Sequence, residues 1–134
     1  MNRKSILALL VKALGSIDVH PKLIEELIKI IIGSGYEARF LKLLGARLEF
    51  LSRHGVDSVK HLEFELIHSG VFSMHLAQGD FNIRILYSFF PDGTPTLLLC
   101  FYEREGKSRT NYTPYIDPAK ARFKERLEAY ENEE

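Results

Sequence analysis

A charged side chain stands in the middle of the most apolar stretch of the chain. Residues 82–90, "NIRILYSFF", are β-branched or aromatic at nearly every position, which is typical of a buried β-strand, yet the third residue is Arg84. A guanidinium stays charged and its planar fork can bind two phosphate oxygens. Arg84 therefore indicates either a functional site on an open sheet face or a structural ion pair with Asp80 or Glu103.

A histidine in the preceding apolar run is the second candidate. Residues 71–77 alternate as a strand, and the turn "QGD" can join them to the strand of Arg84 as a hairpin. Ile83, Ile85 and Tyr87 then share the core face, while His75 comes to lie beside Arg84 on the other face. An imidazole exchanges protons near neutral pH. His75 is either a proton carrier at this site or an ordinary half-buried histidine.

Positive charge gathers towards the end of the chain although the total is balanced. Lysine plus arginine and aspartate plus glutamate number 18 each, so overall charge does not indicate a nucleic-acid binder. Between positions 104 and 126, however, three acidic residues meet seven basic ones: Arg104, Lys107, Arg109, Lys120, Arg122, Lys124 and Arg126. This window either contacts RNA or forms the solvated face of a helix, and its tyrosines, Tyr112 and Tyr115, either stack on bases or pack.

The elements that must position these residues follow from the hydrophobic period. Helical spacing covers 5–14, 21–32 and 36–53, and strand-like runs follow at 61–67, 71–77, 81–90 and 96–104. Asp117 and Pro118 predict the N-cap and first position of a last helix. The fold expected is α+β: N-terminal helices, an antiparallel β-meander of about four strands and a C-terminal helix, within one domain spanning 1–134. The acidic residues 128–134 are expected to form a frayed tail.

The sequence does not indicate a membrane protein, a metalloprotein or a protein held together by disulfides. Lys12 interrupts the apolar run near the N-terminus, which favours an amphipathic helix over a signal peptide, and no stretch approaches the about 20 apolar residues of a membrane span. We therefore expect a cytoplasmic protein. The one cysteine, Cys100, lies in an apolar run. Glycines interrupt the seven-residue spacing of the histidines, so we predict neither a metal nor another cofactor; these histidines are His54, His61, His68 and His75.

The order of these motifs resembles a known family. The run from Gly70 to Tyr130 is similar to the RelE/HigB toxins of bacterial toxin–antitoxin pairs, in particular their phage-derived Gp49-like branch. The matching segments, in order, are "GVFSMHL", "NIRILYSFF", "LLLCFYEREGK" and "PYIDPAKARFKERL". The two-helix segment before Gly55 resembles the family's helical hairpin. Each motif is short, and their order and spacing carry the resemblance.

The resemblance implies a RelE-like fold and a metal-independent endoribonuclease that cuts messenger RNA on the ribosome by attack of a ribose 2′-OH. Arg84 matches the family's strand arginine and would stabilise the transition state, with His75 and Arg104 as the other catalytic candidates. Arg104 falls on the second position of a family Lys-Lys pair. The implied partners are a helix-turn-helix antitoxin of the HigA type, messenger RNA and the ribosome. The RNA-binding candidates are Lys107, Arg109, Tyr112, Tyr115, Lys120 and Lys124.

The chain also departs from the family pattern. A Glu-Leu-Arg triplet reads Ser73-Met74-His75 here, the first lysine of the pair is Glu103, and residues 108–113 are an insertion. The helix around 5–14 is expected to replace the family's N-terminal strand. These departures concern the residues of the site, and a shared fold does not by itself fix the activity. Two functions without RNA cleavage remain open: a gyrase inhibitor like the ParE toxins, or a degenerate toxin that only binds an antitoxin.

Overall fold

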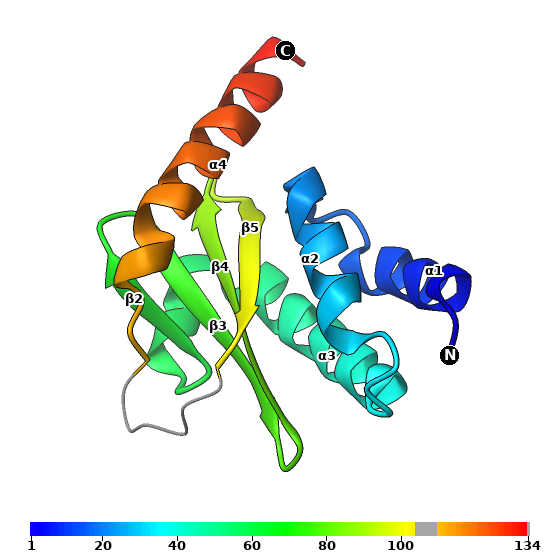
Figure 1. The fold of residues 1–134 in the computed structure, drawn as a ribbon. Helices are drawn as coiled ribbons and strands as arrows, with labels where there is room; N and C mark the ends of the chain where they lie inside the picture. Colours follow the sequence, from blue (N-terminus) through cyan, green and yellow to red (C-terminus); the bar gives the residue numbers. More distant parts are fainter. Residues whose placement is uncertain (104–109, 134) are drawn as a thin grey trace.

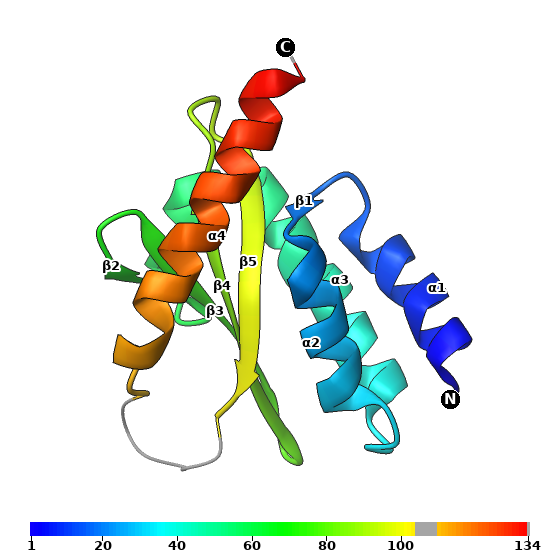
Figure 2. The ribbon, with the colours of Figure 1, turned by 45° about the horizontal axis from the view of Figure 1, so that its top comes forward.

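A single sheet with helices on both of its faces makes up the computed structural model, which describes residues 1–103 and 110–133. Three helices, α1, α2 and α3, lie on one side of the sheet, and α4 crosses the other side (Figures 1 and 2). The predicted α+β class is confirmed. The elements in chain order are α1 (Arg3–Leu14), β1 (Asp18–Val19), α2 (Pro21–Ile31), α3 (Glu37–His54), the 3₁₀ helix η1 (Gly55–Lys60), β2 (Phe64–His68), β3 (Val71–Gln78), β4 (Phe81–Phe89), β5 (Pro95–Tyr102) and α4 (Thr113–Asn132).

The sheet has five strands in the order β1-β5-β4-β3-β2. The last four form the predicted antiparallel meander. The additional strand, β1, pairs in parallel with β5 through Asp18 opposite Thr96 and Val19 opposite Leu97. The expectation that a helix replaces an N-terminal strand is therefore wrong, because the chain contains both. A strand of two residues is too short to show a hydrophobic period.

Each face of the sheet contributes to its own apolar core. On the α1–α3 side, the predicted core residues Ile83, Ile85 and Tyr87 are fully buried with the inward residues of the three helices. The smaller core under α4 buries Val71, Leu86, Leu98, Leu99, Phe101 and Ala119. Burial on both faces explains why the sequence of β4 is apolar at almost every position rather than alternating.

The β3–β4 hairpin has the register that the sequence predicts, with His75 opposite Arg84. Asp80, in the turn, pairs with Arg39 of α3, so it is not the ion-pair partner of Arg84. On the other side of β4, Arg84 lies opposite Phe101 of β5. A bulge between Leu86 and Tyr87 then shifts the register, which sequence alternation alone could not place.

The C-terminal helix is longer than predicted at both ends. It begins at Thr113 instead of after Asp117, so that Pro118 lies inside the helix. It continues to Asn132, and residues 128–132 are therefore helical rather than frayed. Proline costs a helix one hydrogen bond, and contacts of α4 with the sheet compensate for it. No helix in the described ranges is long and apolar enough to cross a membrane.

Candidate functional site

Polar side chains from four separate segments meet on the side of the sheet that α4 covers. Register brings them together: Glu65 of β2 pairs with Ser73 of β3, and His75, two residues further along β3, pairs with Arg84 of β4. Tyr112, directly before α4, adds a phenol from above. We call these five residues the β3 cluster. His75 and Arg84 were predicted to be neighbours, and both belong to it.

Hydrogen bonds connect four of the five members of the β3 cluster: Glu65, Ser73, His75 and Tyr112. Oε1 of Glu65 lies 3.0 Å from Nε2 of His75 and 2.8 Å from the hydroxyl of Tyr112. The same hydroxyl is 2.9 Å from Oγ of Ser73 and 3.2 Å from Nε2 of His75. A phenol has one proton, so Tyr112 donates to one of these acceptors at a time and accepts from another. The arrangement is a closed network in which protons can change places.

Burial and charge favour the neutral form of His75. Burial of the ring lowers its pKa, and the nearby guanidinium of Arg84 lowers it further, while the carboxylate of Glu65 acts in the opposite direction. The imidazole is consequently neutral near pH 7 and able to accept a proton. Burial raises the pKa of Tyr112, which keeps its phenol protonated and able to donate. The β3 cluster thus holds a base and an acid in contact.

Arg84 supplies a fixed positive charge beside this pair. Its Nη1 donates to Oδ1 of Asn82, two residues before it on β4. Its Nε atom is buried and has no hydrogen-bond partner among the described residues. The charge acts on the cluster, because it lowers the pKa values of both His75 and Tyr112. A cation held next to an acid–base pair is an arrangement suited to a reacting phosphate.

Aromatic packing attaches the start of α4 to the sheet next to the cluster. The ring of Tyr115 stacks on Phe101 at 3.8 Å between centroids and 2° between planes, and Tyr112 meets the same ring edge-on at 6.1 Å. Phe101 is the β5 residue opposite Arg84. Of the two tyrosines, Tyr115 therefore packs, whereas Tyr112 packs and also presents its hydroxyl to the site.

Two further predicted residues lie outside the β3 cluster. Lys120 and Lys124 are exposed on α4 beyond Tyr112. Arg104, Lys107 and Arg109 lie outside the described residues. Glu65 was missed by sequence reasoning. Glu65 follows Phe64 on its strand and so faces the other side of the sheet, but the sequence does not give the register of Glu65 with Ser73, and without that register it names no partner.

The chemistry available in this cluster is acid–base chemistry around a cation. In the described part of the chain, no three side chains of histidine, cysteine, aspartate or glutamate lie close enough together to hold a metal ion. Glu65 and His75 therefore form a pair rather than part of a larger ligand set.

Comparison with known proteins adds no assignment: no protein-family model matches the chain, and no curated protein matches its sequence. The likeness to the RelE/HigB toxins therefore rests on the order of the short motifs, and what it implies about activity is a proposal.

Proposed function

We propose that this protein is the toxin of a type II toxin–antitoxin pair and cuts messenger RNA in the cytoplasm, without a metal, by attack of a ribose 2′-OH on the adjacent phosphate. One observation carries the proposal: His75, whose pKa is lowered, lies opposite Arg84 and in contact with Glu65 and Tyr112. The motif order of the RelE/HigB toxins gives independent support. The proposal includes a helix-turn-helix antitoxin and action on the ribosome.

Each step of this reaction has a residue in the β3 cluster. With Nε2 of His75 donating to Glu65, the Nδ1 lone pair accepts the 2′-OH proton. The 2′ oxygen bonds to phosphorus, and Arg84 stabilises the crowded phosphorane. Tyr112 protonates the 5′ oxygen as its bond to phosphorus breaks, which leaves a 2′,3′-cyclic phosphate and a 5′-hydroxyl. Across the 3.2 Å contact the imidazolium passes its Nε2 proton to the phenolate, and exchange of the remaining Nδ1 proton through solvent restores the starting tautomer of His75.

Induction of the chain in bacteria tests the proposal. We expect growth arrest with new transcript 5′ ends inside translated messages, and loss of both in Arg84→Ala. Arg53→Ala is the matched control, because that arginine is 72% exposed on α3 and pairs with Glu49 one turn earlier. Arrest without cuts would support the gyrase-inhibitor alternative instead. No arrest by the wild-type chain would favour the antitoxin-binding module.

Purified protein separates the roles within the cluster. We expect His75→Gln to lower kcat for an RNA oligonucleotide by about 10²- to 10⁴-fold, the usual contribution of a positioned acid or base. Arg84→Lys keeps the charge but loses the planar fork, so it should retain more activity than Arg84→Ala. Near-wild-type kcat in a folded His75→Gln protein, with its fold checked by NMR, would remove His75 from catalysis.

A further inference from the structure

The basic residues of α4 divide between two sides of the helix. Arg122 binds both carboxylate oxygens of Glu26 at 2.8 and 2.6 Å, and Arg126 binds both oxygens of Asp18 at 2.9 and 2.5 Å. These two arginines are directed towards α2 and β1, where their charge is neutralised. Lys120 and Lys124 lie a quarter of a turn or more away and are exposed. The positive charge that α4 offers a ligand therefore lies on its β2–β3 side.

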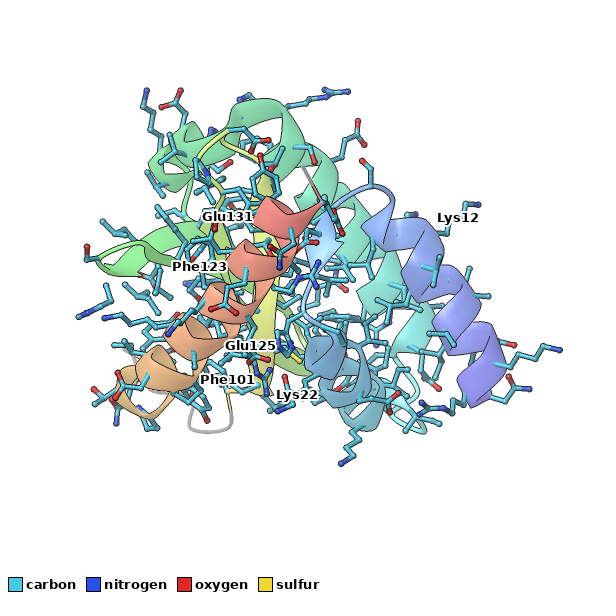
Figure 3. All side chains as sticks on the ribbon, turned by 90° about the horizontal axis from the view of Figure 1, so that it is seen from above. Lys12, Lys22, Phe101, Phe123, Glu125 and Glu131 are labelled. Carbon is cyan, nitrogen blue, oxygen red and sulfur yellow. The ribbon has the colours of Figure 1, made fainter. Side chains whose placement is uncertain are left out.

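A pocket of about 210 Å³ opens on that side, between α4 and the turn that joins β2 to β3. Its polar groups come from Lys120 on the helix and Ser69 in the turn, and Val71 and Phe123 supply an apolar wall. In Figure 3, Phe123 lies on the side of α4 that faces β2, and Glu125 lies on the side that faces α2. The pocket and the β3 cluster both take residues from β3, since Val71 lines the pocket and His75 belongs to the cluster.

The groups in the pocket suit an anion. No acidic side chain lines it, so the Lys120 ammonium is its only formal charge among the described residues. The hydroxyl of Ser88 is already used, because it donates to the carbonyl of Gly70 at 2.5 Å, whereas Ser69 is exposed. Gly70 has φ +74° and no atom within 4 Å of the position where a Cβ would be, so the turn leaves its backbone open to a ligand.

Two independent paths give the distance from this pocket to the β3 cluster. Along β3, Val71 precedes His75 by four residues, which corresponds to about 13 Å. Along the chain leading into α4, Lys120 follows Tyr112 by eight residues, which corresponds to about 12 Å at helical rise. Both paths therefore place the pocket about 12 to 13 Å from the β3 cluster. An extended single strand of RNA covers such a length in about two nucleotide steps.

We propose that the Lys120 pocket is a second phosphate subsite of the RNA-cleaving site proposed above, and that the substrate is single-stranded RNA lying in the groove between α4 and the β2–β3 hairpin. One phosphate is held at Arg84 and another, about two nucleotides away, at Lys120. Phe123 and Val71 contact the intervening sugar or base. Duplex RNA does not fit this scheme, because its phosphates are not presented in one extended row along a narrow groove.

Binding of non-cleavable 2′-O-methyl RNA tests the subsite, with a dinucleotide and a hexanucleotide as probes and Kd measured by fluorescence anisotropy over a range of salt. We expect Lys120→Ala to weaken hexanucleotide binding about tenfold and to reduce the salt slope by about one, and to leave dinucleotide binding unchanged. Lys42→Ala is the control, since that lysine is exposed on α3 across the sheet. With cleavable hexanucleotide, KM should rise in Lys120→Ala while kcat stays the same.

The outcomes separate the subsite from the proposed function. If the wild-type protein binds the hexanucleotide and Lys120→Ala binds it equally well, the subsite is wrong and the ribonuclease proposal stands. An equal loss in Lys42→Ala would also overturn the subsite, because it would show that any surface charge has this effect. If the wild-type protein binds neither probe, the subsite is wrong, and the induction experiment decides the proposed function separately.

Discussion

Two tyrosines in this protein, Tyr87 and Tyr112, differ in the hydrogen bonding of their hydroxyl groups. Tyr87 is fully buried, and its hydroxyl has no hydrogen-bond partner among the described residues; burial also raises its pKa. The hydroxyl of Tyr112 lies within 3.2 Å of three polar side chains. A buried polar group without a partner loses its bonds to water and gains nothing in return.

The two tyrosines should therefore respond oppositely to loss of the hydroxyl. We expect Tyr87→Phe to raise the free energy of unfolding by about 1 kcal/mol and Tyr112→Phe to lower it by about 1 kcal/mol, measured by urea denaturation at pH 7. Tyr102→Phe is the control, because its hydroxyl makes an exposed 3.4 Å contact with the carbonyl of Asp80. Destabilisation by Tyr87→Phe would mean that the hydroxyl has a partner.

The lowered pKa of His75 links protonation to stability. The folded protein binds a proton at His75 less readily than the unfolded chain, whose histidine titrates at about 6.5. His75 therefore makes its full contribution to the free energy of unfolding above about pH 6.5, and this contribution falls as the pH drops towards the pKa of His75 in the folded protein.

We expect Arg84→Ala to raise the pKa of His75, measured by NMR titration of the imidazole, because a repelling charge is removed. An unchanged pKa would show that Arg84 is electrostatically remote.

At the scale of elements, the helix α4 is attached by paired charges as well as by apolar contacts. Arg122 bridges to Glu26 of α2 and also donates to the carbonyl of Leu98 at 3.0 Å, and its side chain is only 16% exposed. Surface ion pairs contribute little because water screens them, whereas breaking a partly buried pair leaves the remaining charge poorly solvated. The packing of α4 against the rest of the protein is therefore sensitive to single substitutions at these ion pairs.

We expect Arg122→Ala to destabilise the protein by about 2 kcal/mol, since it leaves Glu26 without its bidentate partner. Arg53→Ala removes an exposed pair with Glu49 and should cost about 0.5 kcal/mol or less. Urea denaturation at neutral pH measures both. Equal effects of the two substitutions would show that the Arg122 pair is no stronger than a surface pair.

The sequence predicts those parts of the fold that depend on local pattern. Helical spacing located α2 and α3 to within one residue at each end, and the short turn at Asp80 fixed the pairing of His75 with Arg84. The sequence did not predict that Tyr112 would reach the β3 cluster, because Tyr112 and His75 are 37 positions apart in the chain. The predicted start of α4 was wrong. Asp117 and Pro118 form a typical helix start, but the helix begins earlier, at Thr113, and has Pro114 in its first turn.

At the scale of the whole molecule, the two cores differ in size, and the larger one contains the single cysteine. Cys100 lies on β5 and is 7% exposed, and burial raises the pKa of its thiol. A buried thiol with a raised pKa reacts only when the structure opens. The cysteine is thus a natural reporter of opening on the side of the sheet that faces α2.

We expect labelling of Cys100 by a disulfide reagent in native buffer to follow the global unfolding equilibrium. Tyr87→Phe should slow the reaction, and Arg122→Ala should accelerate it, each in proportion to its effect on the unfolding free energy. The measurement is the rate of thiol release at several urea concentrations. A labelling rate that does not depend on urea below the unfolding transition would reveal a local opening of β5 instead.

The parallel pairing of β1 with β5 has a consequence for folding during translation. Asp18 contacts Thr96, 78 positions later, and Arg126, 108 positions later, so the contacts of this edge form only after both of those residues have been synthesised. The strands of the meander begin at Phe64, so α1, α2 and α3 are synthesised before the sheet on which they pack. The apolar faces of these helices are therefore uncovered when they emerge from the ribosome, which makes the growing polypeptide a substrate for chaperones during translation.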